Sequence, residues 1–235
     1  MHLCTYVAMY RKLAQFDVHG RMPDESIILR FRHRLEKYKL AEQILATVND
    51  LLTGQGLLLQ AGTAVDATLI AAPTSTKNKN KARDPEMHSS KKGKQWYFGM
   101  KAHIGVDADS GLVYSVLGTA GHVSDVVQGN ALLHGQERVV FADAGYQGAQ
   151  KYPDARPGVR WHGAMRPGKR RELDKVNGPV DALTDKIEKL KSGIRAKVEH
   201  PFRVIKQRFG FMKVRYRGLK KNTLQRTTLF ALSNL

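Results

Sequence analysis

Apolar residues recur at intervals of three and four in the first quarter of the chain. One such stripe covers residues 27–35 and a second covers residues 40–52, with acidic residues just before the first and Gly54 just after the second. Acids favour a helix N-terminus, and glycine favours the position just beyond a helix. The pattern predicts two consecutive helices in an N-terminal segment, residues 1–55. Because arginines flank the first stripe, the pair either reads DNA or simply packs a core.

The hydrophobic pattern changes after Gly56. Residues 56–72 are rich in apolar and β-branched side chains, which predicts a buried central strand that carries Asp66. Residues 74–94 are polar, Lys-rich and aperiodic. We expect a loop there, either solvated or lying against a phosphate backbone.

Apolar segments of strand length follow this loop. Residues 95–107 and 111–121 flank a turn-forming Ala-Asp-Ser-Gly sequence, which predicts a hairpin. After a short helix within residues 124–133, RVVFADAGYQG predicts a strand with Asp143 at its C-terminal end. RWHGAMRPGKR then predicts a last strand that opens into a basic loop at Pro167.

The longest helical pattern runs from about Leu183 to Arg208. Its apolar residues predict one buried stripe: Leu183, Ile187, Leu190, Ile194, Val198, Phe202 and Ile205. Glu199 lies at the edge of that stripe, and Arg195 and Lys206 fall within about 40° of it around the helix axis. In isolation, such a glutamate is an ordinary ion-pair partner of Arg195 or Arg203.

Taken in order, these elements predict an α/β fold with a small N-terminal helical segment. Residues 56–235 are expected to form one domain, a mixed sheet with flanking helices. In such sheets ligands gather at the C-terminal ends of the strands. The ends of the strands that carry Asp66 and Asp143 are therefore the first place to look for a site.

The charge of the chain points to a polyanionic partner. The sequence has 39 Lys and Arg residues against 21 Asp and Glu residues, a net charge of +18 with a pI near 10.1. Residues 183–235 alone hold 14 basic and three acidic residues, net +11. Binding of DNA phosphates through counterion release explains this excess, although a ribosomal-type basic protein or a merely solvated face would share it.

The composition also excludes several classes of protein. No apolar run approaches the roughly 20 residues that cross a bilayer, so no membrane partner is expected. Met1–Ala8 lacks the features of a secretory signal. The single Cys4 excludes an internal disulfide and a multi-cysteine zinc site. A reducing cytoplasm is the expected location.

Two of the acids occupy positions where a charge is costly. Asp66 and Asp143 lie in or at the end of apolar strands, where an uncompensated carboxylate costs several kcal/mol. Bound divalent ions would hold both ionised, with Glu199 as a third ligand. A set of hard oxygen ligands without cysteine favours Mg²⁺ or Mn²⁺ over zinc.

Recognisable blocks of residues surround these three carboxylates. They are Asp66-Ala-Thr, Asp143-Ala-Gly-Tyr, and Arg195-Ala-Lys-Val-Glu199-His-Pro-Phe followed by Lys206. Other stretches agree: RDPEMH, KQWYFGMKAHIGVD, AMRPGKR, KVRYRGL and LFALSNL. Over roughly residues 20–235 the chain resembles bacterial insertion-sequence transposases, in particular the insertion sequence five group of the insertion sequence four superfamily.

The resemblance implies an RNase H-like catalytic domain in which Asp66, Asp143 and Glu199 hold two Mg²⁺ or Mn²⁺ ions. Its implied chemistry is cleavage of DNA at the element's terminal inverted repeats and strand transfer into target DNA. A homodimer in the synaptic complex and a location at the bacterial nucleoid are also implied. Arg195 and Lys206 match the family's signature around the glutamate, whereas Ser192 stands where the family has a tyrosine.

Further residues are candidates for contact with DNA, each with an alternative. Arg203 and Arg166 fit phosphate binding, although Arg166 also fits a solvated basic loop. Lys101 and His103 share one strand face and either contact phosphate or are a surface lysine and a hydrogen-bonded histidine. Tyr146 either stacks on an unpaired base or packs in the turn after Asp143.

Two departures from the family concern the whole chain. Only 65 residues precede Asp66, and Met1–Arg21 matches the family's pattern poorly. A truncated copy that lacks part of its end-recognition region is therefore expected. The alternatives to an active transposase are a catalytically inactive DNA-binding derivative that acts as a repressor, and a related RNase H-fold nuclease that cuts without strand transfer. Within the long helix, Pro201 removes one backbone donor and is expected to bend the helix just beyond Glu199.

Overall fold

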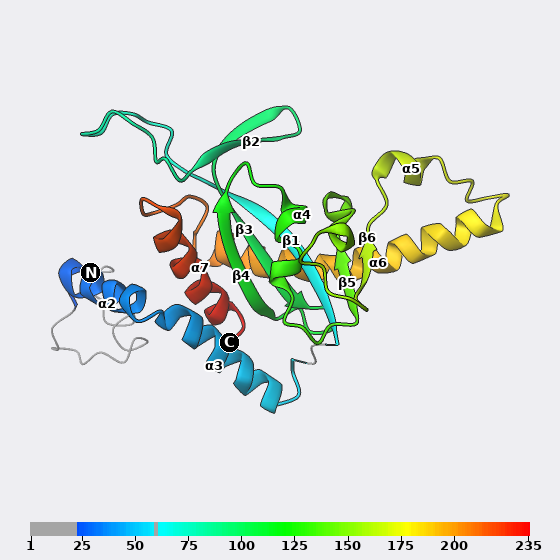
Figure 1. The fold of residues 1–235 in the computed structure, drawn as a ribbon, viewed down its shortest axis with the longest axis horizontal. Coiled ribbons are helices and arrows are strands. Elements are labelled where there is room, and N and C mark those ends of the chain that lie inside the picture. Colours follow the sequence, from blue (N-terminus) through cyan, green and yellow to red (C-terminus); the bar gives the residue numbers. More distant parts are fainter. Residues whose placement is uncertain (1–22, 59–60) are drawn as a thin grey trace, which may run out of the picture. The chain divides into compact units, whose positions relative to one another are not determined.

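The computed structural model describes residues 23–58 and 61–235, which belong to two compact units divided after Leu40 (Figure 1). In the first unit, helix α2 (Glu25–Lys37) begins at Asp24, whose carboxylate accepts a hydrogen bond of 2.8 Å from the backbone N–H of Ile27. The predicted first helix is therefore confirmed. Two features of the sequence, Cys4 and the poorly matching Met1–Arg21, lie outside the described residues.

The second unit is built on a six-stranded mixed sheet. Its strands are β1 (Gly62–Ala71), β2 (His88–Lys92), β3 (Gln95–Asp107), β4 (Val113–Ala120), β5 (Val139–Ala142) and β6 (Arg160–Gly163). The order is β2-β3-β1-β5-β6, and β4 pairs with β3. Strand β3 is antiparallel to β1, β2 and β4, whereas β5 runs parallel to β1 and β6. The predicted mixed sheet and the hairpin of β3 and β4 are confirmed.

Strand β2 corrects one expectation. Residues 74–94 were expected to form a loop throughout, yet His88–Lys92 pairs with Gln95–Gly99 of β3. A turn at Gly93, which has a positive φ of 61°, connects the two strands. The hairpin has no apolar pattern to reveal it, because it lies at the sheet edge and is held by backbone hydrogen bonds.

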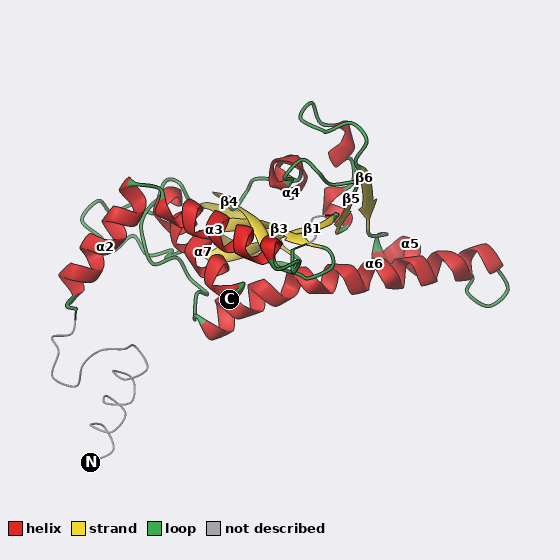
Figure 2. Cartoon of the chain, turned by 90° about the horizontal axis from the view of Figure 1, so that it is seen from below, coloured by secondary structure: helices red, strands yellow, loops and turns green. Residues whose placement is uncertain are grey.

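Helices cover both faces of the sheet, as Figure 2 shows. They are α3 (Leu40–Gly54), α4 (Asp125–Gln128), α6 (Pro179–Arg203) and α7 (Leu219–Ser233), whereas α5 (Pro167–Arg171) lies beside the first half of α6 (Figure 1). On one face, Val198 of α6 and Phe230 of α7 are buried with Ala64 and Ile104 of the sheet. On the other face, Val65 packs with Tyr146 and with residues that follow α4. The basic segment at Pro167, expected to be a loop, forms the short α5.

The second predicted helix, α3, packs within the sheet domain. Leu45, Val48 and Leu52 form a buried cluster with Ala231 of α7. The sequence places this helix in an N-terminal segment that ends at residue 55. In the structure its apolar stripe packs against α7. Among the helices of residues 23–58 and 61–235, none has the length and apolar character needed to cross a membrane.

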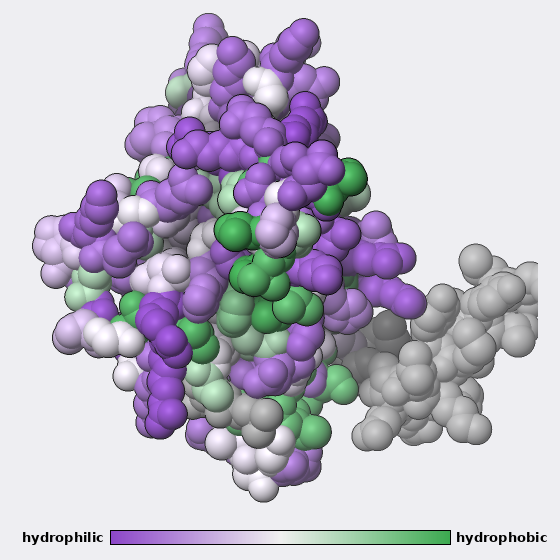
Figure 3. Space-filling view, turned by 90° about the vertical axis from the view of Figure 1, so that its right-hand side faces the viewer, coloured by the Kyte–Doolittle hydropathy of each residue, from purple (hydrophilic) through white to green (hydrophobic). Residues whose placement is uncertain are grey.

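The buried stripe predicted for α6 exists only in its second half. Val198, Phe202 and Ile205 are buried, but Leu183, Ile187 and Leu190 are 59%, 45% and 71% exposed. The first half of α6 runs past the edge strand β6 (Figure 1), so no strand lies under its leucines. The face of the molecule on that side is largely hydrophilic, with a hydrophobic patch near its middle (Figure 3).

The buried residues in the first half of α6 are acids. Asp185 accepts a hydrogen bond of 2.9 Å from Arg170 and lies 3.3 Å from the Lys175 ammonium. Glu188 accepts a hydrogen bond from the backbone N–H of Met165 and pairs with Lys191 at 2.7 Å. The segment between β6 and α6 therefore folds back on the polar side of the helix, which leaves the apolar side open. The expected single buried stripe was wrong for this half.

Candidate functional site

The sheet places Asp66 and Asp143 beside each other. Strands β1 and β5 run parallel with Ala64 opposite Phe141, so continuing that register by two residues brings Asp66 opposite Asp143. Neighbouring strands lie about 4.8 Å apart. Asp143 directly follows β5, and its carboxylate accepts a hydrogen bond of 2.7 Å from the backbone N–H of Gly145. This bond fixes the side chain at the start of a 3-10 turn.

The surroundings of Asp66 disfavour its negative charge. The pKa of Asp66 is raised to about 6, first by burial and also by the charges of Asp143 and Asp125, against the opposing effects of the Ala67 N–H and Arg195. No ion pair reaches Asp66 from the described residues. A half-buried carboxylate beside two others, with no cation bound to it, has the chemistry of a ligand for a divalent ion.

Helix α6 lies over the same region through Lys206. The Lys206 ammonium donates a hydrogen bond of 2.6 Å to the hydroxyl of Thr68, which lies on the same strand face as Asp66 two residues before it. Burial and the charge of Lys92 lower the pKa of Lys206, whereas Asp66 raises it. The ammonium is therefore part of the electrostatic surroundings of Asp66.

Glu199 is placed between two cations that act on Asp66. It lies four residues after Arg195 and seven before Lys206 on the continuous helical segment. Its side chain is exposed and makes no hydrogen bond or ion pair with another described residue. The alternative of a structural ion pair with Arg203 is not formed, because Arg203 donates instead to Gln207 at 3.0 Å.

The three predicted carboxylates are not gathered into one cluster. Among the described residues, no three His, Cys, Asp or Glu side chains are grouped so that they could hold a metal ion. Asp66 and Asp143 are brought together by the sheet, and Glu199 stands on the helix that crosses it. Pro201 is buried inside α6 two residues later, and the helix continues as a π-helical turn, Val204–Arg208, which carries Lys206. Single π-turns often occur at functional sites.

Two of the candidate DNA contacts on β3 point into the protein. The Lys101 ammonium donates to the carboxylate of Asp125 at 2.9 Å and to the backbone oxygen of Val123 at 2.8 Å. His103 is fully buried and forms a 2.8 Å hydrogen bond with the hydroxyl of Thr119. The alternative of a hydrogen-bonded histidine is therefore the one formed, and the ring has no exposed surface for a phosphate.

Tyr146 also packs inside the domain. Its side chain is 2% exposed and its ring stacks on Trp161 with 6.4 Å between ring centres. In this structure the packing alternative applies, and the ring is not available to an unpaired base. Arg166 and Arg203 keep exposed side chains, so both remain available to phosphates.

A basic pocket lies along the part of β1 that follows Asp66. It has a volume of about 270 Å³ and is lined by Thr68, Leu69, Ala71, Lys92, Tyr97, Lys206 and Met212. Lys92 comes from the β2 hairpin and Lys206 from the π-helical turn. Two cations at the edge of a carboxylate site suit an anionic substrate that must approach those carboxylates.

Asp125 is the site residue that the sequence reasoning missed. It begins α4, faces Lys101, and its charge acts on Asp66. A Ser-Asp pair before a short helix has the pattern of an ordinary N-terminal cap. The sequence offered one signal. Lys101 and His103 on β3 require an anionic partner, and Asp125 follows them along the chain.

Residues 58–235 match the sequence model of the family described as the transposase DDE domain. No solved structure matches the chain. The matched region begins just before β1 and includes all six strands together with α4 to α7.

Proposed function

Because the chain belongs to the transposase DDE domain family, we propose that it cleaves DNA strands at the ends of an insertion sequence and transfers them into target DNA. The family acts on DNA by phosphoryl transfer. Within it, we assign this chain to the insertion sequence five group, and we assign catalysis to Asp66, Asp143 and Glu199. The observation that carries the assignment is the register that sets Asp66 beside Asp143, together with the burial that disfavours an ionised Asp66.

The chemistry of the three carboxylates suits two Mg²⁺ or Mn²⁺ ions, although their side chains are not grouped around a metal position in the described residues. Asp66 and Asp143 would hold a shared ion, and Glu199 would complete the set when its side chain, which has no partner in the described structure, turns toward them. Such ions polarise the scissile phosphate and acidify the attacking water or 3′-hydroxyl when bound. The sheet holds the two aspartates in place before substrate arrives, and the hydrogen bond of Gly145 keeps Asp143 oriented.

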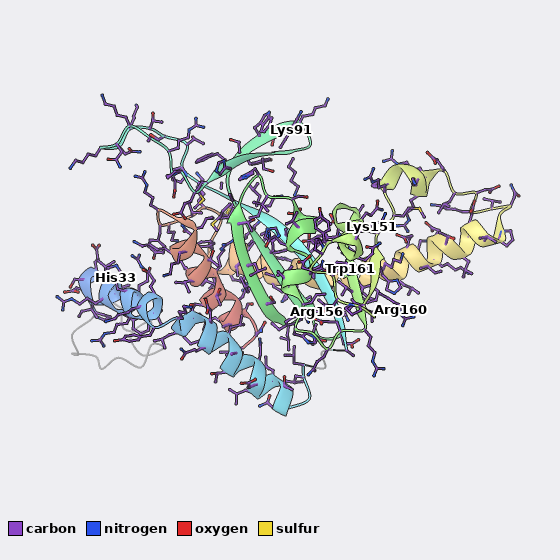
Figure 4. All side chains as sticks on the ribbon, viewed as in Figure 1. His33, Lys91, Lys151, Arg156, Arg160 and Trp161 are labelled. Carbon is purple, nitrogen blue, oxygen red and sulfur yellow. The ribbon has the colours of Figure 1, made fainter. Side chains whose placement is uncertain are left out.

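Cations beside the carboxylates would hold the DNA backbone. Lys206 and Lys92 line the pocket beyond Asp66 on β1. A second pocket, which begins at Ala72 just after β1, is lined by Arg83, Arg215 and Arg217 among others. Figure 4 shows further basic side chains well apart on the domain, with Lys91 on the β2 hairpin and others beside β6. This spread suits a long duplex better than a small anion.

We propose that the active form is a homodimer. An insertion sequence has two ends to be cut and joined, whereas each chain carries one set of carboxylates. Two chains would therefore be required to process both terminal inverted repeats together. A catalytically inactive DNA-binding derivative is the second candidate, and the position of Glu199 outside the aspartate pair favours it over a nuclease that cuts without transfer.

Replacement of Glu199 by Gln tests the assignment. The substrate is an end-labelled duplex that carries the terminal sequence of the element encoding this chain, with Mg²⁺. We expect nicking to fall by orders of magnitude, because a ligand charge is lost, while DNA affinity stays equal or rises slightly as an anion is removed. The control is Glu42→Gln, an exposed glutamate on α3, which should nick like the wild type.

The melting temperature separates catalysis from a structural role. If Glu199 has only a structural role, Glu199→Gln should lower the free energy of unfolding by about 0.5 kcal/mol or less, seen as a modestly lower melting temperature. Nicking should then stay nearly intact. Near-normal nicking by Glu199→Gln would overturn the catalytic assignment. Wild-type protein that binds the duplex tightly without any nicking in Mg²⁺ or Mn²⁺ would favour the inactive DNA-binding derivative.

A further inference from the structure

Two pockets lie one after the other along the end of β1. The lysine pocket, which Lys206 lines together with Lys92, extends to Ala71. The arginine pocket, of about 230 Å³, begins at Ala72. The backbone N–H of Val214 donates to the backbone oxygen of Ala71 at 2.9 Å. The chain segment that follows the π-helical turn is therefore joined to β1 at the point where one pocket gives way to the other.

The arginine pocket carries an excess of positive charge. It is lined by Arg83, Arg215 and Arg217 and by one acid, Asp84. The Asp84 carboxylate accepts a hydrogen bond of 2.7 Å from the backbone N–H of Gly218. Arg215 and Arg217 have exposed side chains that form no ion pair with any residue in the described part of the chain. Their charges are therefore available to an anion from outside the chain.

A buried amide fixes the backbone that carries these two arginines. Asn222 of α7 is fully buried, and its side-chain oxygen accepts hydrogen bonds of 3.2 and 3.3 Å from the backbone N–H groups of Arg215 and Tyr216. Its side-chain nitrogen donates to the backbone oxygens of Tyr216 and Gly218 at 2.7 Å each. The segment that presents Arg215 and Arg217 is thus ordered before any ligand binds, which lowers the entropy lost on binding.

The third arginine of the pocket is also held in place. Arg83 donates from Nε to the backbone oxygen of Thr74 at 3.0 Å, and its guanidinium lies 5.3 Å from the centre of the Phe98 ring. Near it on the same loop, the Glu86 carboxylate accepts the backbone N–H of Leu219 at the start of α7. The part of the loop that carries Arg83 is therefore fixed to the segment that carries the other two arginines.

The spacing of the two pockets suits a chain of phosphates. Lys206 binds Thr68 of β1, and the arginine pocket begins four residues later at Ala72. At about 3.3 Å per strand residue, this separation is about 13 Å. Each strand of a DNA duplex advances about 3.4 Å per phosphate along the helix axis, so about four nucleotides cover the same distance. A single phosphate could occupy one pocket only, whereas a DNA strand could occupy both.

We propose that Arg83, Arg215 and Arg217 form a second phosphate-binding site for the DNA strand that passes Lys206, about four nucleotides farther along that strand. The bound DNA then leaves the carboxylates along β1 toward the start of α7. The inference rests on the proposed function for the identity of the DNA as a substrate. Its binding can be measured without divalent ions, and so without cleavage.

A salt titration of duplex binding in EDTA tests whether both pockets contact the same DNA. The variants are Arg215→Gln with Arg217→Gln, Lys206→Met, and the triple variant, on a labelled duplex with the terminal sequence of the encoding element. The slope of log affinity against log salt should become shallower by about two units, about one unit and about three units, respectively. Because Arg215 and Arg217 are exposed, the melting temperature of their variant should match that of the wild type.

The matched control removes two other exposed arginines, as Arg138→Gln with Arg160→Gln. These residues lie at the start of β5 and β6, whereas Asp143 follows the end of β5. The control should keep the wild-type slope. Arg215→Lys with Arg217→Lys, which preserves both charges, should also stay close to the wild type. A wild-type slope in the Arg215→Gln and Arg217→Gln variant, or an equal change in the control, would overturn the proposal.

Interference by single neutral phosphates measures the spacing. In a panel of duplexes, one phosphate at a time is replaced by an uncharged methylphosphonate, and binding is again measured in EDTA. Two groups of positions on one strand should weaken binding by the wild type, separated by about four nucleotides. Lys206→Met should lose its response at one group, and Arg215→Gln with Arg217→Gln at the other. Coinciding groups, a single group, or a separation above about eight nucleotides would contradict the proposal.

Nicking in Mg²⁺ separates this proposal from the proposed function. If the wild type does not nick but both binding results are as expected, the proposed function fails and the second phosphate site stands. If the wild type nicks while the arginine variant keeps the wild-type slope and interference pattern, the second site is wrong and the transposase assignment stands.

Discussion

The Lys206 ammonium donates a 2.6 Å hydrogen bond to the Thr68 hydroxyl and so connects the π-helical turn after α6 to the strand that carries Asp66. This contact fixes the distance between a helix bearing one proposed catalytic acid and a strand bearing another. It also keeps a partly desolvated cation beside the pocket where a phosphate would approach.

Replacing Lys206 by Met should weaken DNA binding and slow cleavage. Met keeps the length of the side chain but removes both the cation and the bond to Thr68. If Lys206 contacts one phosphate, the dependence of log affinity on log salt should become shallower by about one unit. The measurement is a salt titration of duplex binding, with exposed Lys220→Met on α7 as the control. An unchanged slope would show that Lys206 does not contact the backbone.

Stability between pH 6.5 and 4 should depend on His103. Burial lowers the pKa of His103 to about 4, with Lys101 and Arg226 lowering it and Asp125 opposing them. The unfolded chain binds a proton near pH 6.5 that the folded ring does not bind, so the contribution of His103 to the free energy of unfolding decreases as pH falls through this window, whereas the raised pKa of Asp66 contributes in the opposite direction. His103→Gln, which can keep the Thr119 bond, should therefore gain stability relative to the wild type as pH falls from 6.5 to 4 in urea titrations. A difference between variant and wild type that does not change with pH would contradict the account.

Two glycines should respond in opposite ways to alanine. A Cβ on Gly99 would lie 2.0 Å from the backbone oxygen of Ile70, whereas nothing lies within 4 Å of one on Gly193 in α6. Gly99→Ala should therefore cost about 1–3 kcal/mol of unfolding free energy, while Gly193→Ala should contribute about 0.5–1 kcal/mol through helix propensity. Thermal or urea unfolding of both variants checks the pair, and destabilisation by Gly193→Ala would count against an open α6.

Metal-free protein should become more stable when Asp66 is replaced by Asn. The ionised carboxylate is half-buried beside Asp143, and Asn removes its charge while keeping its shape. The melting temperature in EDTA at pH 7.5 should therefore rise, the usual exchange of stability for function at an active site. Added Mg²⁺ should raise the melting temperature of the wild type and leave that of Asp66→Asn unchanged. A lower melting temperature for the variant would show that Asp66 has a structural partner.

The strands near the site were predictable because they carry strong local signals. Apolar runs end at polar turns around β1 and β5, and each run holds a single acid in a place where an acid is costly. Parallel pairing of β1 with β5 then brings these acids together. The local sequence of the two strands does not predict that they pair. Burial of the first half of the α6 stripe was predicted wrongly. Helical spacing shows which residues share a face of the helix, but it does not show how far the sheet extends beneath that face.

Polar residues were harder to place from the sequence. Lys101 and His103 share a strand face in a basic chain, so contact with phosphate was a fair expectation. Their partner, Asp125, lies some twenty residues away and becomes visible only when α4 folds over β3. Strand β2 was missed because a Lys-rich edge strand is held by backbone bonds that no side-chain pattern encodes.

Metal-dependent nicking by the wild type and Asp66→Asn tests the central claim most directly. The substrate is a duplex with the terminal sequence of the encoding element, and the rate is followed in Mg²⁺ and in EDTA. The account predicts nicking by the wild type only with Mg²⁺, and a loss of at least about a thousandfold in Asp66→Asn. The control Asp50→Asn, on the exposed side of α3, should match the wild type. Nicking by Asp66→Asn within a few-fold of the wild-type rate would contradict the claim.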